Sequence, residues 1–117
     1  MTNEIVKIGS VEIGGIDFDL FDNHGRYFFQ CQNVYKSISE KQTGYSYIYV
    51  CQKLKKVVDD GHRRKFEVNG VYSWYVDVMG LIQFVNSMKV GKACLVKEYL
   101  IRCCANSLEG ILYERKA

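Results

Sequence analysis

Proline is absent from this sequence, and its apolar residues never form a long run. Without proline there is no proline-rich linker to separate domains. No apolar run approaches the ~20 residues that cross a bilayer, and Glu4, Glu12 and Asp17 interrupt the stretch where a secretory signal would be apolar. The 5 cysteines are an odd number, and without a signal they predict free thiols in a reducing compartment. We therefore expect a single intracellular domain over residues 1–117.

Acidic and basic residues are distributed unevenly along the chain. Residues 1–22 contain five acidic residues and one lysine, whereas the whole chain has a net charge of +3. We therefore expect an acidic face and a basic face. Aromatic residues make up 14% of the sequence, and 9 of them are tyrosines, which suit surfaces that are partly apolar and partly wet.

Alternating apolar and acidic residues predict strands in the first third of the chain. Ile16 to Leu20 fits a half-buried strand whose aspartates face water, and Arg26 to Cys31 resumes as a strand after a turn. Residues 16–31 are therefore a predicted hairpin. Two shorter strands, at 5–8 and 11–13, are expected before it, with the glycines at 9, 14 and 15 marking bulges or turns.

Two helices are expected between Asn33 and Gly61. Asn33 is the expected N-cap of a short helix over residues 34–40, with Val34 and Ile38 inward. Residues 45–58 carry tyrosines at strand spacing, but their aliphatic residues recur at helical spacing. We favour a helix of about fourteen residues that ends near Gly61, because glycine and lysines suit a helix C-terminus.

The second half of the chain predicts a hairpin followed by two helices. Asn69-Gly70, between two runs of strand-forming residues over 66–75, favours a two-residue type I′ turn. Asp77 is the expected N-cap of the next helix. Helical spacing relates two sets of apolar residues: Val78, Leu81, Ile82, Val85 and Met88, then Ala93, Val96, Tyr99, Leu100 and Cys103. Residues 109–117 are expected to add an edge strand or to fray. The expected fold is α+β, a small single domain with N-terminal hairpins, a central hairpin and three to four helices.

Several motifs over residues 16–108 resemble the BRO-N domain, the N-terminal module of baculovirus repeated-ORF proteins and phage antirepressors, which is related to the KilA-N DNA-binding group. A strand with the aromatic residues Tyr27-Phe28-Phe29 is followed by Asn33-Val34 at the opening of a helix, and Asn33 replaces the aspartate that is usual in the family. The series Val76-Asp77-Val78-Met79-Gly80-Leu81-Ile82, then Ser87-Met88-Lys89, then Ala93-x-x-Val96-x-x-Tyr99 follows the family's second signature. The last triplet replaces the family's phenylalanine and tryptophan, and one residue is inserted before Ala93. The resemblance implies a viral or prophage regulatory module, in the host nucleus or cytoplasm.

The densest basic segment is the best candidate for a binding site. It holds six cations, diluted only by Asp59 and Asp60: Lys53, Lys55, Lys56, Arg63, Arg64 and Lys65. Lysines and arginines clustered at a helix end and the following loop neutralise phosphates, and arginine also reads base edges. The alternative is a solvated surface with lysines at a helix C-terminus. A second basic series, Lys89, Lys92, Lys97 and Arg102, reads as ordinary solubilising charge.

Metal and catalytic sites are not expected from the remaining residues. The only close cysteine pair is Cys103-Cys104, which lacks zinc-ligand spacing, and Cys51 and Cys94 fall on apolar stripes that predict core positions. Asp22, His24 and Cys31 lie near one another in sequence, but no nucleophile signature surrounds them. Trp74, beside Tyr72 and Tyr75, suits either a base-stacking platform or core packing, and we favour core packing.

These observations predict a nucleic-acid-binding module without a cofactor or small-molecule substrate and without catalytic activity. Double-stranded DNA is favoured over RNA, and the basic helix and loop supply the binding surface. The alternative is a protein-interaction module, including a homodimer in which the acidic residues near 12–22 of one copy meet the basic segment of another.

Overall fold

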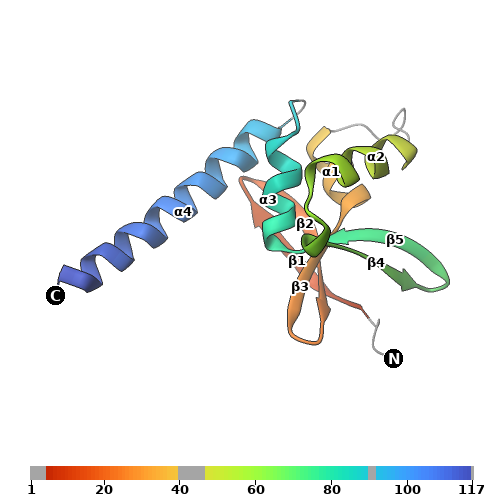
Figure 1. Cartoon of the computed structure of the whole chain (residues 1–117), viewed down its shortest axis with the longest axis horizontal. Helices are drawn as coiled ribbons and strands as arrows, with labels where there is room; N and C mark the ends of the chain where they lie inside the picture. Colours follow the sequence, from red (N-terminus) through yellow and green to blue (C-terminus); the bar gives the residue numbers. More distant parts are fainter. Residues whose placement is uncertain (1–4, 40–46, 90–91, 117) are drawn as a thin grey trace.

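The computed structural model describes residues 5–39, 47–89 and 92–116 (Figure 1). It forms an α+β domain with two N-terminal hairpins, a central hairpin and four α-helices, which confirms the expected fold class. The elements follow in the order β1 Val6–Ile13, β2 Ile16–Asn23, β3 Arg26–Gln30, α1 Cys31–Ser39, α2 Tyr47–Val57, the 3₁₀ turn η1 Asp60–His62, β4 Arg63–Val68, β5 Val71–Val76, α3 Val78–Asn86 and α4 Ala93–Lys116. None of the described helices combines the length and apolar character that crossing a membrane requires.

The five strands form one antiparallel sheet in the order β1-β2-β3-β5-β4. Each hairpin closes through two residues with positive φ, and the predicted turn at Asn69-Gly70 is confirmed with φ of 52° and 81°. Positive φ at both positions is the geometry of a type I′ turn, whose twist matches that of the strands. The two expected short strands at the N-terminus are one strand, β1, in which the pairing register shifts between Lys7 and Gly9. The predicted bulge or turn at Gly9 is therefore confirmed as an irregularity within β1.

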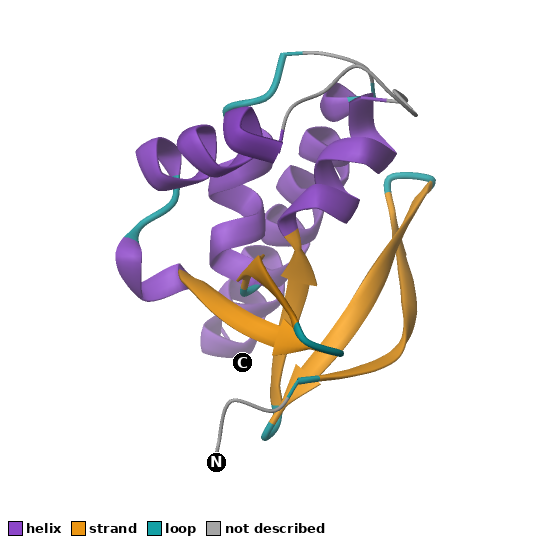
Figure 2. Cartoon of the chain, turned by 90° about the vertical axis from the view of Figure 1, so that its right-hand side faces the viewer, coloured by secondary structure: helices purple, strands orange, loops and turns teal. Residues whose placement is uncertain are grey.

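Apolar side chains cover both faces of this sheet. Neighbouring residues of one strand point to opposite faces, and Phe28 and Phe29 of β3 belong to different clusters. Phe29 lies in the larger cluster, under the helices, which gather on one side of the strands in Figure 2. Phe28 lies in a smaller aromatic cluster with Phe66 and Tyr75. The Phe66 ring meets the other two edge to face, with its centre 5.1 Å from that of Phe28 and 5.5 Å from that of Tyr75. Edge-to-face ring pairs add to the stabilisation that burial alone provides.

Helices α1 and α2 form where they were expected, but their ends differ from the prediction. Asn33 is not an N-cap: α1 begins at Cys31, and Asn33 Oδ1 accepts a hydrogen bond from the Asp19 N–H of β2 at 3.1 Å. Its side chain therefore ties the first turn of α1 to the sheet. Helix α2 ends at Val57, earlier than Gly61, because the chain turns there into η1. The helical interpretation of residues 47–57 is confirmed, whereas residues 45 and 46 lie outside the described part.

Helix α4 leaves the body of the domain after two turns (Figure 1). Ala93 and Val96 are buried as predicted, but Tyr99 is 45% exposed and Cys103 is also exposed. The predicted core position of Cys94 is wrong, since this residue faces solvent. The predicted edge strand over 109–117 is also wrong, because the helix continues to Lys116. The apolar residues of a helical stripe are buried only where another element packs against the helix.

Candidate nucleic-acid interface

The indole of Trp74, on β5, lies between lysines from helix α2 and strand β4. Its ring is half-buried and packs against the larger core cluster. Lys65, the residue opposite it on β4, places Nζ 5.8 Å from the ring centroid. Lys55 of α2 places its Nζ 5.6 Å from the same centroid, and Arg63 Cζ lies 5.8 Å from it. The negative face of an indole attracts cations, so this ring gathers three of them. Together Lys55, Arg63, Lys65 and Trp74 form the Trp74 face.

Arg63 has structural partners within this face. Its guanidinium donates hydrogen bonds to the Val58 carbonyl oxygen, just after α2, and to Asp60 Oδ1 at 3.1 Å. The side chain is only 17% exposed. Arg63 therefore ties the chain after α2 to β4, and Asp60 compensates part of its charge. Lys55 and Lys65 are the cations of the Trp74 face that reach solvent.

Arg64 points away from the Trp74 face. Residues 63–65 were expected in a loop, but they belong to strand β4, where side chains alternate between faces. Arg64 lies opposite Tyr75, whose ring is in the aromatic cluster on the other side of the sheet from Trp74. Cross-strand neighbours share a face. The structure therefore separates Arg64 from Arg63 and Lys65.

Lys53 and Lys56 lie on another side of α2 from Lys55. They are three residues apart, which places them on one helix face, and both line a pocket with Tyr49. Lys53 Nζ lies 6.0 Å from the centre of the Tyr49 ring. The six predicted site residues thus occupy three places: the Trp74 face, this pocket and the opposite side of the hairpin.

The two aspartates within the basic segment do not neutralise its lysines. Asp59 Oδ2 accepts a hydrogen bond from Gln83 Nε2 of α3 at 2.9 Å, and its N–H donates to Gln83 Oε1 at 3.0 Å. Asp60 pairs with Arg63 at 3.1 Å. Among the described residues, Lys55 and Lys65 of the Trp74 face therefore have no ion-pair partner.

Lys89 is a residue whose place the sequence did not indicate. It was assigned to ordinary surface charge, but it lines the same pocket as Lys53 and Lys56. It follows α3, so only the packing of α3 beside α2 brings it there. Tyr35 and Tyr49 also line this pocket, and their spacing in the sequence does not predict that they meet. The high tyrosine content was the only feature of the sequence that suggested tyrosines at such a surface.

The cysteine and histidine residues are dispersed. Cys31 is buried at the start of α1, and burial, then the nearby Cys51, raises the pKa of its thiol. A raised pKa keeps the thiol protonated, which is opposite to what a nucleophile requires. His24 lies in the exposed β2–β3 turn, while Asp22 Oδ1 accepts the Gly25 N–H at 3.2 Å. Among the described residues, no three metal-ligating side chains come together.

The geometry defines a small α+β domain with helices on one face of a curved antiparallel sheet and a cationic surface around Trp74. No protein-family model, no curated protein sequence and no solved structure matches this chain. The resemblance to the BRO-N domain therefore stays a prediction that rests on the motifs of the sequence.

Proposed function

We propose that this domain binds nucleic acid, in the first place double-stranded DNA, through the Trp74 face. The observation that supports the proposal is the convergence of Lys55 and Lys65 from two elements on one indole ring. The ring holds both cations on one surface, and no carboxylate among the described residues forms an ion pair with them. The resemblance to the BRO-N domain is the reason for choosing duplex DNA and a viral or prophage regulatory role.

Binding would proceed by neutralising phosphates. Lys55 and Lys65 contact backbone phosphates, and the counterions released on binding supply the free energy, without regard to base sequence. Lys53 and Lys56 add to the positive field of α2. Trp74 acts mainly by positioning the cations, because it is partly buried against the core and cations occupy its face.

A salt titration of fluorescence anisotropy with a labelled duplex tests the proposal. We expect the logarithm of the binding constant to fall linearly with the logarithm of salt concentration. Replacing both solvent-reaching lysines, as Lys55→Gln with Lys65→Gln, should reduce the slope by about 2, since each phosphate contact contributes about 1. Duplex RNA and single-stranded DNA, titrated in parallel, establish the preferred nucleic acid.

Arg64→Gln is the matched control for this titration. It removes one positive charge from the same strand, next to Lys65, but from the opposite face. The slope should change by less than about half a unit. An unchanged slope in the double lysine variant, or an equal loss in Arg64→Gln, would reject the Trp74 face as the binding surface.

A second candidate function is self-association of two copies through α4. Leu95, Tyr99 and Ile101 are 47%, 45% and 66% exposed, and residues 101–106 all face solvent. Most helical stability comes from packing rather than propensity, and a second α4 packed along this 24-residue helix would bury these apolar side chains. Light scattering should give twice the monomer mass for the wild type and the monomer mass for Ile101→Glu. A monomeric wild type rejects this candidate.

A further inference from the structure

A pocket of about 470 Å³ opens between α1, α2 and the end of α3. Its inner wall is apolar and aromatic. Tyr35 of α1 is 8% exposed and Met88 is 1% exposed, while Tyr49 of α2 is 45% exposed and stands at the mouth. The two tyrosine rings meet edge to face with their centres 5.8 Å apart. The volume is within the range of about 300–1,000 Å³ typical of small-molecule sites.

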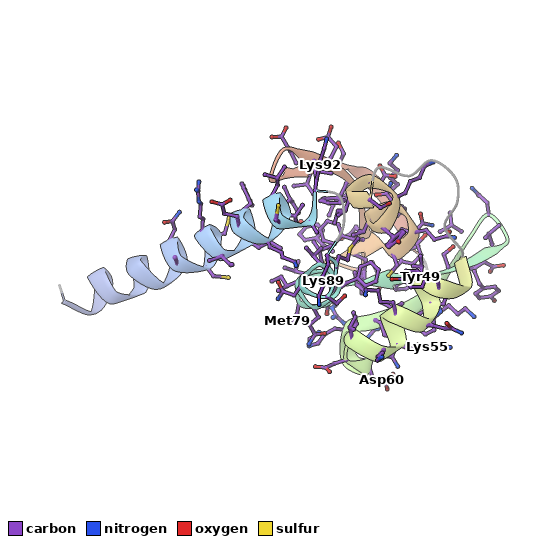
Figure 3. The ribbon with its side chains drawn as sticks, turned by 90° about the horizontal axis from the view of Figure 1, so that it is seen from above. Tyr49, Lys55, Asp60, Met79, Lys89 and Lys92 are labelled. Carbon is purple, nitrogen blue, oxygen red and sulfur yellow. The ribbon has the colours of Figure 1, made fainter. Side chains whose placement is uncertain are left out.

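Three lysines surround this pocket. Lys53 and Lys56 come from α2, and Lys89 comes from the segment after α3. No aspartate or glutamate is among the described residues that line it, and none of those described pairs with these three lysines. Figure 3 shows Lys89 and Tyr49 on the neighbouring elements that bound the pocket, with Lys55 further out on α2. Three lysines without a carboxylate beside them among the described residues give the hollow a positive potential that attracts anions.

The lining has an apolar, aromatic part and a cationic part, so it fits a ligand with one apolar and one anionic part. An inorganic anion would leave the aromatic wall exposed to water. A purely apolar ligand would leave three ammonium groups without a counter-charge. Lysine binds phosphate as a point charge. The Tyr49 ring carries Lys53 Nζ 6.0 Å from its centre, and the part of it that stays exposed offers aromatic contact to a planar ring.

We propose that this pocket binds a nucleoside phosphate, with the base against Tyr49 and the apolar wall and the phosphate between Lys53, Lys56 and Lys89. The ligand is either a free nucleotide or the terminal nucleotide of a strand, since both present the same base and phosphate. The proposal does not depend on duplex binding, because the Trp74 face shares no residue with the pocket.

Nuclear magnetic resonance titrations of the full chain test the pocket, with adenosine 5′-monophosphate as the probe. We expect saturable shifts at Tyr35, Tyr49 and residues 87–89, with affinity at least about tenfold higher than for adenosine or for inorganic phosphate. A short single-stranded oligonucleotide with a 5′-phosphate, compared with the same strand without it, tests the strand end as the source. Tighter binding of the phosphorylated strand supports the same chemistry.

Two double variants separate this site from the Trp74 face. Lys56→Gln with Lys89→Gln should weaken binding of the nucleotide at least about tenfold, and Lys55→Gln with Lys65→Gln should change it less than about twofold. Amide spectra of both variants, compared with the wild type, show that each is folded. The proposal is overturned if neither the nucleotide nor the phosphorylated strand saturates by about 10 mM, if inorganic phosphate binds equally well, or if both double variants lose equal affinity. Duplex titrations on the same variants report the Trp74 face separately.

Discussion

Arg26 and Asp77 are separated by 51 positions in the sequence, yet the Arg26 guanidinium donates a hydrogen bond to Asp77 Oδ2 at 2.9 Å. The same oxygen lies 3.0 Å from His62 Nδ1, and Asp77 Oδ1 accepts the Gly80 N–H at 2.8 Å. Asp77 is thus the N-cap of α3, as predicted, and it also joins α3 to β3 and η1. The Asp77 carboxylate therefore connects the β2–β3 hairpin to η1, which leads into strand β4 of the Trp74 face.

Two substitutions of Asp77 should separate its capping role from its charge. Asp77→Ala removes both and should lower the free energy of unfolding by about 2–3 kcal/mol, whereas Asp77→Asn should cost only about 1 kcal/mol. Asparagine keeps a side-chain oxygen for the Gly80 N–H but loses the charge that attracts Arg26. Urea denaturation measures both values. Asp17→Asn, on an exposed position of β2, is the control, and equal losses in the two Asp77 variants would contradict the capping role.

The contribution of Asp77 to stability should depend on pH at the acid end. Burial raises the pKa of this carboxyl, but hydrogen bonds from His62 and Gly80 and the nearby charge of Arg26 outweigh burial, so its pKa is lower than the ordinary 3.8. A pKa lowered by folding stabilises the native state above the unfolded value, and this stabilisation is lost as the pH falls through the folded value. The difference in unfolding free energy between wild type and Asp77→Asn should therefore be constant above about pH 5 and shrink below it. A difference that persists at the lowest pH where both proteins fold would contradict the assignment.

Gly80→Ala should destabilise the protein although alanine favours helices. A Cβ at this position would clash with the His62 carbonyl oxygen and lie 2.9 Å from Val76 Cβ, so the backbone must move. We expect a loss of about 1–3 kcal/mol in urea denaturation, larger than the gain of up to about 1 kcal/mol from helix propensity. Gly61→Ala is the matched control in the adjoining 3₁₀ turn, where a Cβ meets nothing within 4 Å. Similar losses in the two variants would show that close packing against His62 is not the cause.

The cysteines should differ in their reaction with a thiol reagent. Cys94, Cys103 and Cys104 are exposed and should react in the native protein, whereas Cys31 is buried and burial, then Cys51, raises its thiol pKa. Absorbance with Ellman's reagent, with and without denaturant, measures the two classes, and mass spectrometry assigns them. Cys31→Ala should leave the native reaction unchanged and remove one thiol from the denatured count. Fast native modification of Cys31 would contradict its burial.

Local sequence signals predicted much of the fold. The Asn69-Gly70 turn, the Asp77 cap and the alternation around Phe18 depend on neighbouring residues alone, and all three are confirmed. The Asn33 cap was wrong because its side chain bonds to strand β2, at Asp19, instead of to its own helix. The start of β4 at Arg63 was missed, since basic residues rarely signal a strand, and with it the alternation that separates Arg64 from Lys65.

The sequence by itself determined the α+β class, the position of the hairpins and which segment is most basic, because turn geometry, periodicity and charge are properties of short stretches. The tertiary structure alone decided which of those charges share a surface. The packing of α2 beside β5 brings Lys55 to Trp74, and the packing of α3 beside α2 brings Lys89 to Lys53 and Lys56. Such contacts join residues that are distant in the chain, so no local pattern encodes them.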